Sequence, residues 1–138
     1  AFSPDGEWIA FVSDRGGSPQ IYIMESKGKR LRRLTFKGSY NTSPAWSPAG
    51  KWIAFVGRKH GKNQIFMIKS DGADLIQLTD RGNNENPSFS PDGMFITFDS
   101  DRAGLKGIYL MNINGGELKR ISPQQIKAIN PQWSPYKK

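Results

Sequence analysis

The stretch Trp46-Ser47-Pro48-Ala49-Gly50 decides how this 138-residue chain is organised, because the chain contains four related copies of it. The other copies are Phe-Ser-Pro-Asp-Gly at residues 2–6 and 89–93, and Trp-Ser-Pro-Tyr at residues 133–136. Proline fixes φ at the first corner of a type I turn, and glycine accepts the positive φ needed to leave the turn. Each complete copy therefore predicts a tight turn between two antiparallel strands.

The four turns are evenly spaced, since their serines at positions 3, 47, 90 and 134 are 44, 43 and 44 residues apart. A period of this length, enclosing aromatic and β-branched runs, is typical of a β-propeller in which each repeat forms one four-stranded blade. We therefore expect an all-β fold with three four-stranded antiparallel blades, half of a six-bladed ring. The chain, residues 1–138, would be a partial β-propeller domain with blades at about residues 1–40, 41–83 and 84–126, followed by a closing inner strand at about 127–136.

Apolar runs place the remaining strands of each blade. The second strands are expected at residues 8–12, 52–56 and 95–99, and the third strands at 21–24, 65–68 and 108–111. They are apolar at nearly every position, as in sheets covered on both faces. The outer strands, with alternating apolar residues, are expected at residues 31–35, 75–79 and 118–122.

The loops of such a meander alternate between the two ends of the blades. The Ser-Pro turns and the turns around Gly28, Gly72 and Gly115 share one end and are short. The other end carries longer polar loops, and the only length change between repeats falls there. Because insertions in repeat proteins collect on one face, often the binding face, we expect function at this second end.

The charge of the chain is basic but evenly spread. The formal net charge of +8 divides as +3, +2 and +3 among residues 1–45, 46–88 and 89–138. The one dense cluster comprises Lys27, Lys29, Arg30, Arg32 and Arg33. This distribution favours a solvated basic surface over a nucleic-acid-binding stripe. The chain has no cysteine and no apolar run long enough to span a membrane.

No arrangement of residues predicts catalysis, a metal or a cofactor. The chain lacks a Gly-x-Ser-x-Gly motif and a Walker-type glycine loop, and His60 is its single histidine. We expect His60 to be an exposed loop residue rather than a ligand. Asp99 replaces the apolar Val12 and Val56 of the other repeats and is expected to face the channel or a blade interface.

Asp14-Arg15 and Asp101-Arg102 occupy equivalent positions where the second strands end. Two interpretations are open. Either the pair clamps a charged ligand, or Asp caps the loop backbone while Arg pairs with a neighbouring blade. Because the pair repeats with the blade, we favour the structural interpretation.

Residues that differ between the repeats in the long-loop end are the candidates for partner binding. Aromatic anchors with a polar rim are typical of protein interfaces. The asparagines among the candidates serve equally well as turn formers. The candidate partner-binding residues are Tyr40, Asn41, Thr42, His60, Asn84, Glu85, Asn86, Lys127 and Ile129.

These repeats, with Ser-Pro-Asp-Gly, Ile-Ala-Phe, Ser-Asp-Arg and Ile-Tyr, resemble the propeller repeat of the TolB family. Residues 40–48 (Tyr-Asn-Thr-Ser-Pro-Ala-Trp-Ser-Pro) and 130–135 (Asn-Pro-Gln-Trp-Ser-Pro) are similar to the C-terminal half of that propeller. The resemblance implies a periplasmic, non-enzymatic propeller of the Tol–Pal system, which serves cell-envelope integrity and cell division. Its partners would be the peptidoglycan-associated lipoprotein Pal and, in some bacteria, colicins.

One alternative accompanies this hypothesis. Related repeats occur in the propellers of prolyl-oligopeptidase-type serine peptidases, so the chain would instead gate substrate for a catalytic domain outside this sequence. A separate prediction concerns closure of the ring: the strand at residues 129–135 completes the first blade of another copy, so that a homodimer forms a six-bladed ring.

Overall fold

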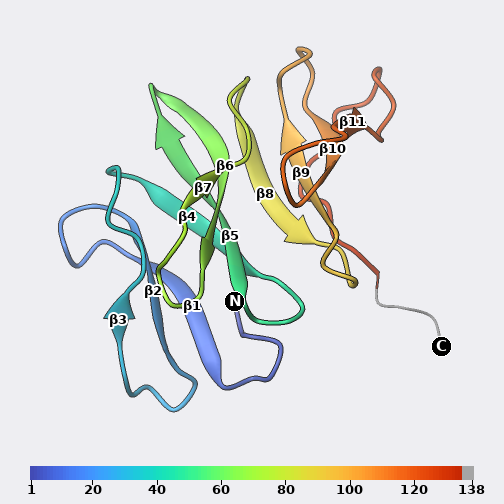
Figure 1. The fold of residues 1–138 in the computed structure, drawn as a ribbon. Helices are drawn as coiled ribbons and strands as arrows, with labels where there is room; N and C mark the ends of the chain where they lie inside the picture. The colour runs from blue at the N-terminus through green and yellow to red at the C-terminus, as the bar shows by residue number, and fades with distance from the viewer. Residues whose placement is uncertain (135–138) are drawn as a thin grey trace.

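The structure, a computed structural model that describes residues 1–134, consists of three antiparallel sheets fanned side by side (Figure 1). The first sheet contains β1 (Trp8–Ser13), β2 (Gln20–Glu25) and β3 (Arg32–Arg33). The second sheet contains β4 (Asn41–Trp46), β5 (Trp52–Lys59), β6 (Lys62–Lys69) and β7 (Ile76–Gln77). The third sheet contains β8 (Asn84–Phe89), β9 (Phe95–Ser100), β10 (Gly107–Asn112) and β11 (Lys119–Arg120). The described residues include no helix, so the predicted all-β fold is confirmed.

The first sheet corrects one part of the prediction, because it has three strands and not four. Only Ala1 and Phe2 precede its Ser-Pro-Asp-Gly turn. They contribute an isolated bridge between Phe2 and Ile9, and the carbonyl of Ala1 accepts a 2.8 Å hydrogen bond from the Ala10 amide. Two residues cannot extend the ladder into a strand.

The outer strands are also shorter than predicted, with two residues each instead of five. A side chain takes over the ladder where each outer strand ends. The Ile21 amide donates to the Thr35 hydroxyl at 2.9 Å, and the Ile65 amide donates to the Thr79 hydroxyl at 2.8 Å. The threonine side chain thus satisfies a buried amide that the sheet no longer reaches.

The Ser-Pro turns form as predicted. In the second sheet the Gly50 amide donates to the Ser47 carbonyl at 2.9 Å, with φ of 74° at Gly50. The buried Ser47 hydroxyl accepts the amide of Trp52, the first residue of β5, at 3.0 Å. Each turn serine thereby fixes the start of the next strand.

Two apolar clusters hold neighbouring sheets together. Ile21, Ile23 and Leu34 of the first sheet pack against buried residues of the second, which include Phe55. The other face of the second sheet packs on the third, where Phe98 is fully buried. Each sheet interface is therefore a separate apolar layer.

A buried polar network joins consecutive sheets beside these layers. The Gln20 side-chain carbonyl accepts hydrogen bonds from the Thr35 hydroxyl at 2.7 Å and from the Asn41 amide at 2.8 Å. Gln20 and Thr35 belong to the first sheet and its outgoing loop, whereas Asn41 opens the second sheet. We call this arrangement the Gln–Thr–Asn network, and it ties the loop between two sheets to both of them.

The network repeats at the next interface. Gln64 accepts from Thr79 at 2.7 Å and from Asn84 at 2.9 Å. In the third sheet all three positions change together, to Gly107, Ser122 and Ala128. The Ser122 hydroxyl keeps only the bond from the Ile108 amide, at 2.9 Å.

Residues 127–134 follow the course of an inner strand without a ladder partner. The Ala128 amide donates to the Lys106 carbonyl at 2.8 Å, as the Asn41 amide donates to Pro19 at 2.9 Å. The Trp133 indole donates to the Ser88 carbonyl at 3.1 Å, which repeats a 2.9 Å bond between the corresponding indole of Trp46 and the Ala1 carbonyl. Residues 127–134 form no strand, and residues 135 and 136 of the predicted closing strand lie outside the described part.

Loss of the network at one interface tests its contribution to stability. Asn84→Ala removes the donor to Gln64 and the acceptor of Arg102, leaving buried polar atoms without partners. We expect the free energy of unfolding to fall by about 2–3 kcal/mol, measured by urea denaturation. Gln125→Ala, at an exposed position, is the control, and an equal effect of both variants would contradict the assignment.

Candidate partner-binding face

The two ends of the sheets differ in character. Figure 1 shows the β5–β6 hairpin, the start of β8 and the β9–β10 loop together at one end, with the Ser-Pro turns at the opposite end. The start of β4 lies at the same end as the β5–β6 hairpin, because Asn41 pairs with Gly57. We call this end of the sheets the loop face.

Asn41 and Asn84 are buried beneath the loop face and form hydrogen bonds that hold its loops. They are 5% and 0% exposed, and their amide groups take part in the Gln–Thr–Asn networks described above. Asn41 also donates to the Lys37 carbonyl at 2.9 Å, and Asn84 to the Arg81 carbonyl at 3.0 Å. Both side chains hold their loops in shape.

Tyr40 and Thr42 flank the first of these asparagines. The guanidinium carbon of Arg58 lies 3.9 Å from the centroid of the half-buried Tyr40 ring, and the Arg58 amide donates to the Tyr40 carbonyl at 3.0 Å. Thr42 is half-buried in β4 and pairs with Val56. Tyr40 thus presents a partly exposed aromatic ring that packs against the Arg58 guanidinium.

His60 occupies the apex of the β5–β6 hairpin. His60 and Gly61 both have positive φ, 52° and 77°, as a two-residue turn of type I′ requires. The imidazole is exposed, and Lys59 and Lys62 flank the turn in the sequence. This hairpin replaces the longer loops that follow β1 and β9.

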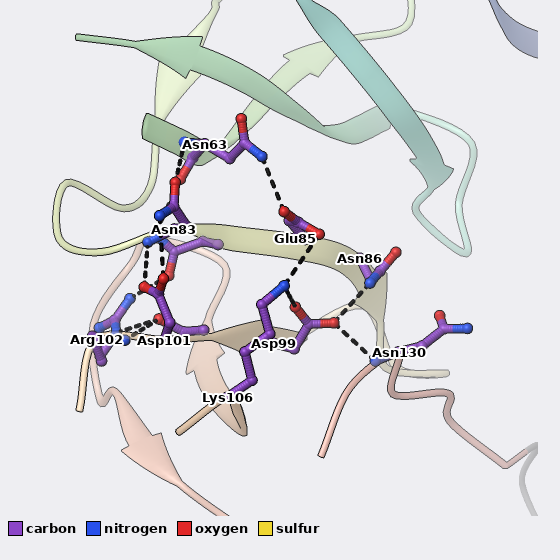
Figure 2. Close-up of polar contacts among 11 residues, drawn as sticks. Asn63, Asn83, Glu85, Asn86, Asp99, Asp101, Arg102, Lys106 and Asn130 are labelled. Atoms are coloured by element: carbon purple, nitrogen blue, oxygen red, sulfur yellow. Dashed lines mark hydrogen bonds and ion pairs between the residues drawn. The ribbon is translucent and has the colours of Figure 1, made fainter. Parts of the chain in front are cut away.

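A chain of polar contacts runs from the second sheet across the third (Figure 2). The Asn63 side chain donates to Glu85 Oε1 at 3.0 Å, and Glu85 Oε2 lies 3.5 Å from Lys106 Nζ. Lys106 Nζ is in turn 3.9 Å from Oδ1 of Asp99. Glu85 and Lys106 are partly exposed, so the outer part of this chain faces solvent.

Asp99 forms the buried end of the chain of polar contacts. Its Oδ2 accepts the Asn86 side chain at 2.7 Å and the Asn130 backbone amide at 2.8 Å. The residue is fully buried, and Oδ1 has no hydrogen-bond partner among the described residues. Asp99 thus faces an interface between inner segments, one of the two positions that the sequence left open. The partners Asn86 and Asn130 were not predicted.

The inner edge of the loop face has a repeated backbone shape. Ser43, Asn86 and Asn130 lie 43 and 44 residues apart and all have φ of 56–57°. The first two coincide with register shifts in β4 and β8, where an extra residue breaks the ladder. All three line a shallow polar hollow of about 220 Å³.

Asp101 caps the loop that enters the third sheet. Its Oδ1 accepts the Asn83 amide at 2.7 Å and its Oδ2 accepts the Asn83 side chain at 3.1 Å. The backbone hydrogen bond from Asn83 is the main cause that lowers the pKa of Asp101 below its usual range, with further contributions from the Asn83 side chain and nearby lysines. The capping role expected of Asp is therefore seen at Asp101, whereas the adjacent Arg102 donates to Asn84 Oδ1 at 2.8 Å within its own sheet and not to a neighbouring blade as expected.

Lys127 and Ile129 lie on either side of Ala128 in the terminal segment. Both are exposed, Ile129 at 54%. Their position along the course of an inner strand separates them from Tyr40 and His60 by a full sheet. The nine candidates therefore divide into a buried pair, a group around the second and third sheets, and this terminal pair.

The chemistry of the face suits recognition by hydrogen bonds and charge. Across residues 1–134 no three His, Asp or Glu side chains are grouped as metal ligands would be. Within the same residues no helix has the length and hydropathy that a membrane span requires.

Comparison with known proteins identifies relatives of the whole repeat array. Residues 1–137 match the family described as the TolB beta propeller domain. The structure superposes on a putative TolB from Agrobacterium tumefaciens with a TM-score of 0.91 and 31% identity, covering 97% of this chain and 49% of that one. For TolB from Acinetobacter baumannii the TM-score is 0.74 and the identity 36%, covering 83% and 29% of the two chains.

A shorter match involves a peptidase. The chain is 44% identical over 46 residues to the uncharacterized peptidase YuxL of Bacillus subtilis, which is 33% of this chain and 7% of that protein. The chain thus spans half or less of the length of each of these relatives.

The carboxylate of Asp101 makes stability depend on pH. Because its pKa is lowered in the folded protein, its contribution is complete above the unfolded value of about 3.9 and is lost as pH falls through the folded pKa. We expect Asp101→Asn to lower the free energy of unfolding by about 1 kcal/mol at pH 7, with a smaller difference below pH 4, in urea titrations at several pH values.

The equivalent substitution Asp14→Asn is a matched control. Asp14 is exposed and its carboxylate makes no hydrogen bond to the described residues, so the effect should stay within about 0.5 kcal/mol at every pH. A difference for Asp101→Asn that did not change with pH would show that the charge has no role.

Proposed function

Because this chain belongs to the TolB beta propeller domain family, we propose that it is a non-enzymatic, protein-binding propeller of the Tol–Pal system of the cell envelope. Its location would be the periplasm and its partner a Pal-like lipoprotein, with colicins as a further class of partner. The observation that carries the proposal is the 0.91 TM-score with a putative TolB at 31% identity over nearly the whole of this chain.

The loop face supplies the contacts in this proposal. Tyr40 is an aromatic residue of limited flexibility, since Arg58 stacks on its ring, and such residues dominate the energy of protein interfaces. Thr42, His60, Glu85 and Asn86 would form the polar rim, with Lys127 and Ile129 on the terminal segment. Asn41 and Asn84 would act by holding the loops.

A peptidase-associated propeller is the second candidate, favoured by the match to the YuxL peptidase. In that case the chain would gate substrate for an α/β-hydrolase domain encoded further along the same gene. The reading frame distinguishes the two, because only the peptidase requires a downstream nucleophilic serine in a Gly-x-Ser-x-Gly context.

Substitution of Tyr40 tests the proposed face. Tyr40→Ala should weaken binding of a purified Pal-like lipoprotein by at least about tenfold, because it removes the aromatic anchor of the interface. Calorimetric titration measures the affinity. Lys29→Ala, exposed in the turn between β2 and β3 at the opposite end, should leave the affinity unchanged, and the reverse pattern would move the site to that end.

We also propose that two copies of this 138-residue chain associate to complete a six-bladed ring. Ile108 and Leu110 of β10 are partly exposed, although the equivalent Ile65 and Met67 of β6 are 0% and 4% exposed beneath the third sheet. Phe11 of β1 is likewise partly exposed, whereas its equivalent Phe98 is fully buried. A second copy would cover both faces.

Sedimentation velocity tests this association. The 138-residue protein should sediment as a dimer at micromolar concentration, and deletion of residues 129–138 should yield monomers. A folded, stable monomer of the undeleted chain would refute the proposal.

A further inference from the structure

Each sheet carries one stacked aromatic pair, which bridges β1 and β2, β5 and β6, or β9 and β10. The ring centroids are 6.0 Å apart for Phe11–Tyr22, 5.6 Å for Phe55–Phe66 and 6.0 Å for Phe98–Tyr109. In the first and third sheets an arginine covers the pair. The guanidinium carbon of Arg15 lies 5.2 Å from the Tyr22 centroid, and that of Arg102 lies 4.9 Å from the Tyr109 centroid.

A serine holds each of these arginines in place. Arg15 Nε donates to the Ser13 hydroxyl at 2.9 Å, and Arg102 Nε donates to the Ser100 hydroxyl at 3.0 Å. In the third sheet Arg102 also donates to Asn84 Oδ1, so the guanidinium fills the space between the aromatic pair and the incoming loop. The loop is close there, since a Cβ on Gly82 would lie 3.0 Å from the Arg102 Cα.

The second sheet lacks this cover. Its sequence at the equivalent positions is Gly57, Arg58 and Lys59, and the Lys59 ammonium donates instead to the Gln77 side chain at 3.0 Å. Among the described residues no cation lies over the Phe55–Phe66 pair, and none donates to Oδ1 of the buried Asn41. One acceptor and one aromatic surface therefore remain free where Arg102 and its equivalents would lie.

The result is a recess between the first and second sheets. The loop that leads into β4 is less closely packed than the loop that leads into β8. A Cβ on Gly38 would lie 4.0 Å from its nearest neighbours, whereas a Cβ on the equivalent Gly82 would lie 2.9 Å from its nearest neighbour. The recess has a volume of about 500 Å³, with Phe55, Phe66, Leu34 and Asn41 among its lining residues. We call it the inter-sheet recess.

The charged residues of the inter-sheet recess are all basic. Lys37, Arg58 and Lys59 contribute to its lining, and no carboxylate does. In the third sheet, by contrast, Asp80 and Asp101 lie near Arg102 and favour its charge. A lone cation is therefore disfavoured in the inter-sheet recess, whereas a flat apolar group attached to negative charge is favoured.

We propose that the inter-sheet recess binds an acidic peptide segment of a partner protein through a tyrosine side chain. The ring stacks on Phe66, as aromatic pairs do in protein interiors, and the phenol donates to the free Asn41 Oδ1. Carboxylates beside the tyrosine pair with Lys37, Arg58 and Lys59. This site does not depend on the identity of the lipoprotein proposed above, because Tyr40 is not part of its lining.

Labelled peptides test the chemistry of the site. Fluorescence anisotropy with the full chain should detect binding of acetyl-Glu-Asp-Tyr-Glu-Asp-amide that weakens as salt is raised. Replacement of its tyrosine by alanine should reduce affinity by more than about tenfold, and replacement by phenylalanine by a smaller factor, because only the hydrogen bond is lost. A peptide with arginine in place of tyrosine that bound equally well would overturn the charge argument.

A charge-conserving variant tests the position of the site. Lys59→Arg restores the residue type of Arg15 and Arg102, so its guanidinium should cover Phe66 and fill the inter-sheet recess. We expect more than about tenfold weaker binding of the tyrosine peptide, with an unchanged urea midpoint or a higher one. Lys29→Arg, at the opposite end, is the matched control. Equal binding by wild-type protein and Lys59→Arg would overturn the proposal and leave the lipoprotein proposal standing.

Discussion

The arrangement of the three sheets depends on one backbone amide in each of β2, β6 and β10. This amide lies just beyond the end of the short outer strand and needs another hydrogen-bond acceptor. Outer strands of two residues leave the amides of Ile21, Ile65 and Ile108 without a backbone partner, in a buried position for Ile21 and Ile65 and a part-buried one for Ile108. An unpaired buried amide costs about 1–3 kcal/mol, so a hydroxyl must reach it. Thr35, Thr79 and Ser122 supply that hydroxyl in the three sheets.

The same hydroxyl carries the connection to the next sheet. The Thr35 hydroxyl donates a hydrogen bond to the Gln20 side-chain carbonyl. The same carbonyl accepts a hydrogen bond from the side-chain amide of Asn41, the first residue of β4. One solution to a local backbone problem therefore sets the distance between two sheets and the course of the loop between them. Because the candidate residues Tyr40 and Thr42 adjoin Asn41, the loop face inherits its geometry from a buried network.

The two interfaces between sheets use this network differently. The second and third sheets are joined by the full network, and Arg102 of the third sheet donates to Asn84, the member of the network in that sheet. The first and second sheets have the network without the arginine, which leaves the inter-sheet recess. Sheets built from the same repeat thus present different surfaces, and binding specificity in repeat proteins arises from such differences.

Much of this fold could be predicted from the sequence because turns and periodicity are local or repeated signals. The Ser-Pro turns depend on φ at two residues, and the 44-residue period requires no knowledge of contacts. The lengths of the outer strands were not predictable in the same way. Apolar residues on both sides of the short strand, such as Leu31 and Leu34, extend the apparent strand, but the threonine hydroxyl replaces the ladder. A hydrogen bond between segments 14 residues apart leaves no mark in a strand pattern.

The candidate site was harder to predict, because asparagine serves turns, interfaces and buried networks alike. One signal would have separated Asn41 and Asn84 from the rest. Both are preceded by a glutamine and a threonine that are 15 residues apart, and all three positions change together in the third repeat, to Gly107, Ser122 and Ala128. Such a joint change indicates contact between the three positions.

The joint change at the third repeat also explains why Asp99 appears there. Without Gln and Asn at the network positions, the segment at residues 127–134 needs another tie to the third sheet, and Asp99 provides it by accepting the Asn130 amide. A valine at this position, as in the first two repeats, could not accept that bond. A carboxylate without solvent contact requires donors, and Asn86 and Asn130 supply them, while the Lys106 ammonium lies 3.9 Å from Oδ1 as an ion pair. The contact between the third sheet and residues 127–134 therefore has a charged network in place of the neutral one. The outer members of this charged network, Lys106 and Glu85, lie on the loop face.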